Sequence, residues 1–208
     1  MNAASNHQSR FAALQGQKPD AIDTPALVLD AEAVNRNMQR MAEFAAKHQI
    51  KLRPHAKLHK SADIARLQMQ AGAVGVCVQT VGEGEALAAG GVNDIFISNE
   101  IVSPAKLRRV AGLAQLLKNR SGKLAIAVDS DEGIDRLALA MQTTSAAIDV
   151  FIEIDVGQGR CGVAPEFYSQ RTRDLEEVLP WAHTSPGVSE DFLRREWQRA
   201  EEAALTHD

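Results

Sequence analysis

The segment RPHAKLHK, residues 53–60, gathers the side chains of this sequence that are best suited to chemistry. It places two histidines and three cations within eight residues, and Lys57 and Lys60 are two of those cations. Crowded positive charges and burial both lower the pKa of a lysine, and the neutral amine that results can attack a carbonyl carbon. The segment therefore indicates a reactive lysine. From residue types alone, a solvated basic loop is an equally good interpretation.

The same segment offers a weaker case for a metal site. His55 and His59 are four residues apart, a spacing that aligns two ligands only on a helix, and no carboxylate lies close to them in the sequence. We therefore assign no metal ligands. Cys77 and Cys161 lie far apart, each in or beside an apolar stretch, which favours buried thiols over a disulfide or a zinc site.

Alternating apolar runs and helical patterns predict the elements that position this segment. Short β-branched runs followed by helical periodicity are typical of repeated βα units with a parallel sheet. Asp30 and Ser61 each precede a helical pattern and are expected to cap it, and Ser103 followed by Pro104 predicts the start of a third helix. Residues 53–60 follow a predicted strand end, which is where barrel enzymes place catalytic groups. The predicted strands cover residues 25–29, 51–55, 74–79, 94–98, 124–128 and 150–154.

These patterns predict an α/β fold, namely an incomplete (β/α) TIM-type barrel with about five parallel barrel strands. Residues 1–23 are expected to form an N-terminal extension, residues 24–165 a partial barrel domain, and residues 166–208 a helical tail. Strand-like runs stop after residue 165, and both tryptophans and the only tyrosine follow it. We expect the tail to be a helical extension or the product of an altered reading frame, and in both cases foreign to the barrel.

Four blocks of sequence carry a family resemblance. They occur in the order RPHAKLHK, AGAVGVCVQTVGEGEAL, DIFISNEIVSPAKL and FIEIDVGQGRCGV, with TPALVLD before the first. Together they resemble the D-threonine aldolase / D-serine dehydratase family of pyridoxal phosphate (PLP) enzymes, which has the alanine racemase-type fold (fold type III). The resemblance implies that Lys57 binds PLP covalently and that Lys60 is only its neighbour. Because these lysines are three residues apart, we expect only one to face the pocket. Leu58 departs from the threonine that the family often has.

The resemblance also implies further contacts with the cofactor. Arg160 matches the family arginine near the phenolic oxygen of PLP, which a guanidinium would hold as the phenolate. His55 and Gln79 are expected to face the cofactor, and Ser98 and Asn99 occupy the equivalent place one strand later. Without the resemblance, a surface arginine in a turn and ordinary hydrogen bonding at strand ends are the alternatives.

Gly157, Gly159 and Gly162 raise the alternative of a dinucleotide-binding domain, because they spell G-x-G-x-x-G after a predicted strand. We reject this alternative because the fingerprint opens the first βα turn of such a domain and leads directly into a helix. Here the pattern follows five βα-like units and runs into Pro165.

Parts of the family's machinery are not found in this sequence. The resemblance implies that the first of the six predicted strands, residues 25–29, belongs with a second, β-rich domain, so five barrel strands are expected where a closed barrel has eight. The resemblance implies a phosphate-binding loop and a divalent metal whose ligands would lie later in the chain; His183 and His207 have no matching context and are not assigned. Open sheet edges and the missing metal ligands lead us to expect no turnover by this chain alone.

The expected function is that of a metal-assisted, PLP-dependent lyase of D-3-hydroxy amino acids, of the D-threonine aldolase or D-serine dehydratase type, here truncated. The alternative is a non-catalytic single-domain PLP-binding protein or an inactive fragment. A small D-amino acid is the expected substrate, and the resemblance implies a homodimer for the full-length family. The formal charge of -4 leaves no basic face for nucleic acid, and no apolar run reaches the about 20 residues of a membrane helix. We expect a cytoplasmic protein.

Overall fold

The computed structural model of the protein describes residues 14–164, 192, 194–195 and 198–199. The chain divides into two compact units, Met1–Phe151 and Ile152–Asp208. The elements that position the Lys57 segment belong to the first unit.

Short strands and helices alternate along the chain from residue 62 onward, which confirms the expected α/β fold. Two helical segments precede this alternation. In chain order, the elements are η1 (Pro19–Ala21), α2 (Ala31–Lys47), α3 (Ala62–Gln70), β1 (Val76–Val78), α4 (Val81–Ala89), β2 (Asp94–Ile97), α5 (Pro104–Lys118), β3 (Lys123–Val128), α6 (Asp131–Met141) and β4 (Asp149–Ile152).

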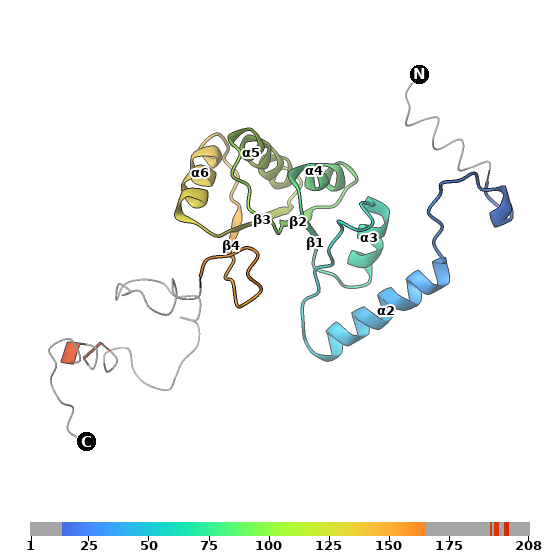
Figure 1. Ribbon diagram of the computed structural model, residues 1–208, viewed down its shortest axis with the longest axis horizontal. Coiled ribbons are helices and arrows are strands. Elements are labelled where there is room, and N and C mark those ends of the chain that lie inside the picture. The colour runs from blue at the N-terminus through green and yellow to red at the C-terminus, as the bar shows by residue number, and fades with distance from the viewer. Residues whose placement is uncertain (1–13, 165–191, 193, 196–197, 200–208) are drawn as a thin grey trace. The chain divides into compact units, whose positions relative to one another are not determined.

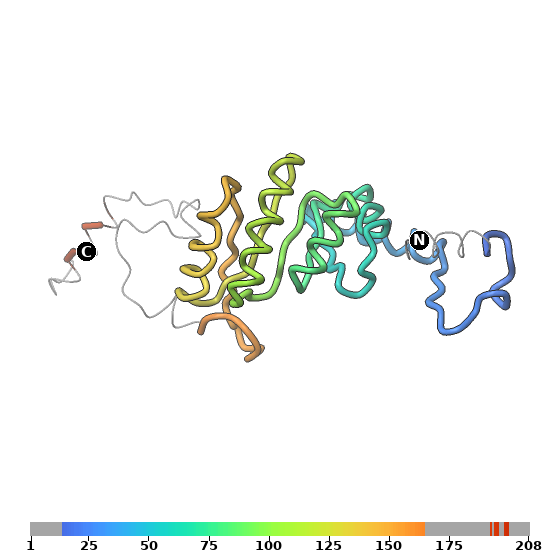
Figure 2. The backbone as a smooth tube through the Cα atoms, turned by 90° about the horizontal axis from the view of Figure 1, so that it is seen from above, coloured from blue at the N-terminus to red at the C-terminus, as the bar shows by residue number. Residues whose placement is uncertain are grey.

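The four strands form one sheet in the order β1-β2-β3-β4, so that each strand lies beside the next strand of the chain. β1 pairs with β2, and β2 pairs with β3, in parallel. In this register Val76 lies opposite Ile95, which in turn lies opposite Leu124. The helices follow the same order from α3 to α6 along the sheet (Figure 1 and Figure 2). Sequential parallel strands with covering helices are the arrangement of an incomplete TIM-type barrel, as predicted.

Alternate residues of the strands form the core beneath the helices, because successive side chains of a strand point to opposite faces. α5 supplies the largest buried stripe of any helix in the described chain, which includes Leu107, Val110 and Leu117. Burying an apolar side chain of this size contributes about 1.5–3 kcal/mol, so this layer holds the unit together. The strand residues in this core are Val76, Val78, Ile95, Ile97, Leu124, Ile126 and Val128.

The intervening strand residues form the other face of the sheet. Cys77, Ala125 and Ala127 are buried there, although they are not part of the core beneath the helices. The ring centroids of Phe96 and Phe151 lie 5.0 Å apart. In a barrel this is the interior face, and its layers of side chains lead to the catalytic end.

An ion pair occupies the amino-terminal end of the first two strands. Arg53 Nη1 lies 2.6 Å from Asp94 Oδ1, and the two side chains are only 28% and 25% exposed. Gly75 lies beside this pair because a Cβ atom would stand 2.6 Å from the carbonyl oxygen of Asp94 and 2.7 Å from its Oδ1, and would also meet Arg53 Nη1. The pair therefore depends on a glycine at residue 75.

Two of the predicted strands are not strands in the structure, and the prediction was wrong for both. Residues 51–55 contribute only a single parallel bridge, between His55 and Cys77. Pro54 has no N–H group to donate, which limits a ladder at this point. Residues 25–29 have no regular secondary structure and are exposed, with Leu27 at 88%. They pair with no strand within the described part of the chain.

The three predicted helix starts are confirmed. The side chain of Asp30 accepts a hydrogen bond from the N–H of Ala33, and that of Ser61 accepts one from the N–H of Ile64. Ser103 precedes α5 with Pro104 at its first position, but its side chain makes no capping hydrogen bond. Capping and proline thus set the helix starts as the residue types indicate.

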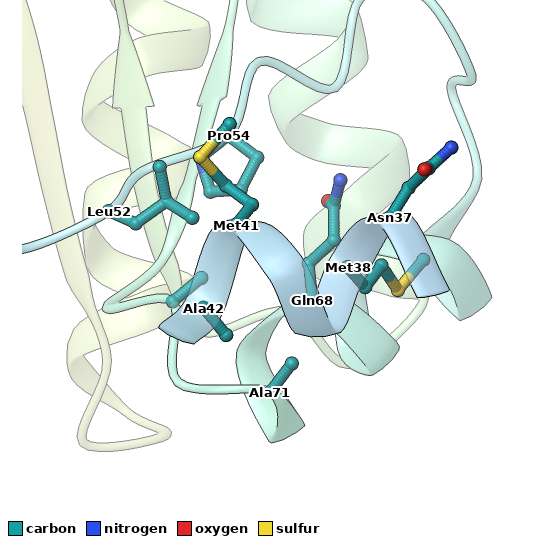
Figure 3. Close-up of a pocket in the computed structure, with 9 residues that line it drawn as sticks. Asn37, Met38, Met41, Ala42, Leu52, Pro54, Gln68 and Ala71 are labelled. Atoms are coloured by element: carbon teal, nitrogen blue, oxygen red, sulfur yellow. The ribbon is translucent and has the colours of Figure 1, made fainter. Parts of the chain in front are cut away.

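α2 packs less tightly than the other long helices, and Ala45 is its only buried residue. A largely apolar cavity of about 350 Å³ lies between α2, α3 and the segment before His55. Figure 3 shows Met38 and Met41 of α2 together with Leu52 and Pro54 at this cavity. It holds none of the predicted site residues, so we interpret it as incomplete packing of α2.

None of the described helices combines the length and apolar composition that a membrane crossing needs.

Candidate active site

Lys57 lies in a turn directly after His55, at the carboxyl-terminal end of the segment that runs beside β1. The N–H of Ala56 donates to the carbonyl of Cys77 at 2.7 Å, and this bond anchors the turn to β1. Lys57 itself is exposed. Lys57 therefore follows the end of the segment that runs beside β1, as expected, and this segment lies at the edge of the described sheet, outside β1.

Hydrogen bonds link the Lys57 side chain to the ends of the next two strands. Lys57 Nζ donates to Gln79 Oε1 at 3.3 Å, and Gln79 Nε2 donates to Asn99 Oδ1 at 3.4 Å. Gln79 directly follows β1, and Asn99 lies two residues after β2. The expected meeting of Lys57 and Gln79 at one end of the sheet is therefore present in the structure.

His55 stabilises the turn that carries Lys57 through a hydrogen bond to the backbone of that turn. Its Nδ1 accepts a hydrogen bond from the N–H of Lys57 at 3.3 Å, so the neutral ring carries its hydrogen on Nε2. Nε2 lies 3.4 Å from Ser98 Oγ, which donates to the carbonyl of Val78 at 3.2 Å. Burial, followed by the positive charge of Lys57, lowers the pKa of His55 below its ordinary value of 6.5. His55 therefore acts as a neutral support for the turn.

Lys60 reaches the same connection between β1 and α4 as Lys57 does. Its Nζ lies 3.2 Å from Glu83 Oε1, while Lys57 Nζ contacts Gln79. The expectation that only one of these lysines faces the pocket stays a prediction, because the contacts with Gln79 and Glu83 do not show which lysine faces a cofactor. The chain turns between them, with the N–H of Lys60 donating to the carbonyl of Ala56 at 2.8 Å. One helical turn brings residues at i and i+3 to the same side.

His59 has a structural environment. Its Nδ1 accepts a hydrogen bond from the N–H of Ser61 at 3.1 Å, and burial is the main reason why its pKa is lowered. Within residues 14–164, neither His55 nor His59 belongs to a group of three or more side chains close enough to bind a metal ion. The interpretation of these histidines as a metal pair is therefore not supported.

The two cysteines are both free thiols, as predicted, but only Cys77 is buried; Cys161 is partly exposed, which corrects the prediction for that residue. Burial raises the pKa of the Cys77 thiol, and the nearby Ser98 hydroxyl only partly offsets this effect. Cys77 is therefore an unreactive buried thiol.

A cavity of about 350 Å³ opens beside the Lys57 network. It lies at the connections that follow β1 and β2, and Gln79 and Asn99 line it. Lys106 and Arg109 of α5 add positive charge to its wall. Its size is within the usual range for sites that bind small molecules.

Arg160 belongs to the second unit, in a loop that folds around Asp155. Asp155 Oδ1 accepts hydrogen bonds from the N–H groups of Gly157 and Gly159, both at 2.9 Å. These bonds lower the pKa of Asp155 below its ordinary value, and the bond from Gly159 has the larger effect. Gly157 and Gly159 have φ angles of 116° and 65°, which favour glycine, and the loop closes with a bridge from Ile154 to Val163. The predicted role of Arg160 in binding PLP stays a prediction.

The same loop argues against dinucleotide binding. In that kind of site, backbone N–H groups of the glycine-rich turn face the pyrophosphate. Here the N–H groups of Gly157 and Gly159 are already bound to the carboxylate of Asp155. An acidic group in this place would also repel a phosphate.

Comparison with known proteins identifies relatives of this chain. D-threonine aldolase from Arthrobacter sp is 43% identical over 161 residues, which are 76% of this chain and 41% of that protein. 3-Hydroxy-D-aspartate aldolase from Paracoccus denitrificans is 41% identical over 152 residues, covering 73% of this chain and 38% of the relative. The chain thus spans about two fifths of the length of these relatives.

A solved structure and a family model agree with these relatives. The crystal structure of D-threonine aldolase from Filomicrobium marinum is 45% identical, with a TM-score of 0.65 over 69% of this chain and 38% of that one. The family described as "Alanine racemase, N-terminal domain" matches residues 29–204. This match extends past residue 165, where we placed the start of a foreign tail; that boundary stays a prediction, and it lies at the limit of the continuously described residues. The chain belongs to the alanine racemase N-terminal domain family.

Proposed function

We propose that this chain is the cofactor-binding part of a PLP-dependent lyase that acts on D-3-hydroxy amino acids, with Lys57 as the residue that binds PLP. The observation that carries the proposal is the exposed Lys57 amine, which lies at the carboxyl end of the sheet with a neutral amide as its hydrogen-bond partner. A neutral partner does not hold the amine in an ion pair, and an amine can attack a carbonyl carbon.

The residues present fit the covalent attachment of PLP. Gln79 orients the Lys57 amine, and neutral His55 holds the backbone of its turn. The cavity beside Gln79 and Asn99 leaves space for a small ligand. When bound, PLP supplies the electron sink for the bond that is broken in the amino acid. Arg160 is proposed to hold the phenolic oxygen of the cofactor.

The substrate class follows from the names of the relatives. They include D-threonine aldolase, 3-hydroxy-D-aspartate aldolase, D-threo-3-hydroxyaspartate dehydratase and D-serine dehydratase. Each name specifies a D-amino acid with a hydroxyl group on carbon 3. Cleavage of the bond between carbons 2 and 3 and loss of that hydroxyl are both lyase reactions, and we propose one of the two for the whole protein.

A divalent metal is proposed for the whole protein as well. One related solved structure is of a D-threo-3-hydroxyaspartate dehydratase variant in a metal-free form, and it matches this chain at 34% identity. A metal would hold the substrate hydroxyl as a Lewis acid. We assign it no ligands in this chain. We also propose that the whole protein is a homodimer in the cytoplasm.

The proposal is tested by trapping the adduct on the protein. PLP is added to the purified chain, the adduct is reduced with borohydride, and the modified peptide is identified by mass spectrometry. We expect the label on Lys57, complete loss of that label in Lys57→Ala, and retention of most of it in Lys60→Ala, because only Lys57 has a neutral partner. Retention of the adduct without Lys57, or equal loss in both variants, would contradict the assignment.

A further inference from the structure

The structure brings two amines, not one, to the connection between β1 and α4. Lys57 Nζ contacts Gln79 Oε1 at 3.3 Å, and Lys60 Nζ lies 3.2 Å from Glu83 Oε1. Both lysines are exposed, so both are accessible to a soluble aldehyde. Something other than access must then decide which one reacts.

The partners of the two amines differ in charge. Lys57 contacts the side-chain amide oxygen of Gln79, which is neutral. Lys60 contacts the carboxylate of Glu83. A carboxylate stabilises the ammonium form of a neighbouring lysine, whereas only the neutral amine attacks a carbonyl carbon.

Glu83 is held firmly in the place where it meets Lys60. Its Oε2 accepts hydrogen bonds from the N–H groups of Gln79 at 2.9 Å and Thr80 at 3.3 Å, and its own N–H donates to Thr80 Oγ1 at 3.2 Å. This is a capping box at the start of α4. The Glu83 side chain is only 14% exposed. The fold therefore fixes the position of the carboxylate.

Glu83 also remains ionised at neutral pH. Partial burial raises its pKa, but the hydrogen bonds from Gln79, Lys60 and Thr80 outweigh this effect, so the pKa lies below its ordinary value of 4.5. One carboxylate thus does two things. It binds the backbone of Gln79, whose side chain holds Lys57, and it pairs with Lys60.

We propose that Glu83 is a positioning residue that selects the reactive lysine: it holds Lys60 in an ion pair and leaves Lys57 as the amine that condenses with the cofactor aldehyde. The inference rests on the function proposed above. The condensation forms one C=N bond and releases one water molecule, and borohydride reduces that bond to a secondary amine. The Lys60 side chain is 66% exposed, so the selection is expected to be moderate, about three- to tenfold.

The test measures the reactivity of each lysine without PLP. The full chain is labelled with trace acetic anhydride, and the rates at Lys57 and Lys60 are read by mass spectrometry. Lys60 is expected to react more slowly than Lys57 in the parent protein. In Glu83→Gln the rate at Lys60 should rise about three- to tenfold, because the amide still accepts the hydrogen bonds of the capping box but carries no charge.

A matched control removes another ion pair from the same helix. Glu85→Gln breaks the pair between Glu85 and Arg109, which does not involve either lysine. It should leave both labelling rates unchanged.

A second measurement uses the parent protein without any variant. Salt at about 1 M screens an exposed ion pair, so it should also raise the labelling rate at Lys60.

The same proteins are then treated with PLP and borohydride. The parent should carry the label on Lys57, and Glu83→Gln should carry an added label on Lys60. Equal rates for the two lysines in the parent, or a rate at Lys60 that neither Glu83→Gln nor salt changes, overturns the inference. If Lys60 is released in Glu83→Gln but PLP labels neither lysine, the selection by Glu83 is supported and the proposed function is the part that fails.

Discussion

The two ends of the first parallel strands both carry clustered charges, but they are built differently. At the amino end, Arg53 and Asp94 form a close pair that is mostly shielded from solvent. At the carboxyl end, Lys60 is paired with Glu83, whereas Lys57 contacts only a neutral amide. In the first cluster, the cation Arg53 is paired with a carboxylate. In the second cluster, the carboxylate of Glu83 pairs with Lys60 and not with Lys57.

This difference separates a structural use of charge from a chemical one. A shielded cation with a carboxylate partner is stable as a cation, so it contributes to the fold and is chemically inert. The Lys57 amine has a neutral partner and is not held in an ion pair by that contact. The same sheet thus holds a paired cation at one end and, under the function proposed above, the reactive amine at the other.

The largest effect is expected at the amino end, from Gly75→Ala. The added Cβ would stand 2.6 Å from a backbone oxygen, which cannot rotate away as a flexible side chain could. We expect the free energy of unfolding to fall by about 2–3 kcal/mol, measured by urea denaturation. Labelling of Lys57 by PLP in the folded fraction should stay unchanged.

Gly112→Ala is the matched control for this substitution. Gly112 lies in α5, and nothing stands within 4 Å of the position its Cβ would take. Alanine in a helix should stabilise the protein by about 0.5–1 kcal/mol. A similar loss of stability in both variants would show that the Arg53–Asp94 cluster is not what requires a glycine at residue 75.

A smaller effect is expected at the carboxyl end, from Gln79→Glu. This change gives Lys57 the kind of partner that Lys60 already has. We expect the fraction of Lys57 labelled by PLP and borohydride near neutral pH to fall about three- to tenfold. Gln70→Glu, in the exposed last residue of α3, adds the same charge away from this contact and should have no effect. Unchanged labelling in Gln79→Glu would mean that the neutral partner of Lys57 is irrelevant.

The smallest effect is a dependence of stability on pH that comes from the carboxyl end. Burial is the main cause that lowers the pKa of both His55 and His59 in the folded protein. The unfolded chain therefore binds more protons near pH 6.5, so these histidines contribute stability that is present above that pH and is lost as the pH falls through their folded pKa values. We expect the free energy of unfolding to decrease between about pH 7.5 and pH 5.5. The double variant His55→Gln/His59→Gln should show a shallower slope, and an equal slope would contradict this origin.

Local patterns in the sequence predicted much of the fold. Asp30 and Ser61 were correctly identified as helix caps because a cap depends only on the next three residues. The runs around β1, β2 and β3 were predicted because buried parallel strands are continuously apolar. Residues 25–29 have the same composition as a strand, but a strand also needs a partner, and its composition does not specify one.

The candidate site was predicted only in part. Lys57 and Gln79 were expected at one end of the sheet, and the hydrogen bond between them is present. Glu83 was missed. The sequence T-V-G-E contains the signal of a capping box, which places Glu83 at the start of α4. Its contact with Lys60 depends on how two distant turns come together, and no local pattern encodes that distance.

The order of the strands has a consequence for how the protein forms during synthesis. Because each strand lies beside the next strand of the chain, no step requires a long loop to close. Each βα unit can dock onto the preceding one as the chain leaves the ribosome, and contacts that are close in sequence favour rapid folding. Of the two edges of the growing sheet, the one formed last is covered by the next strand to be translated.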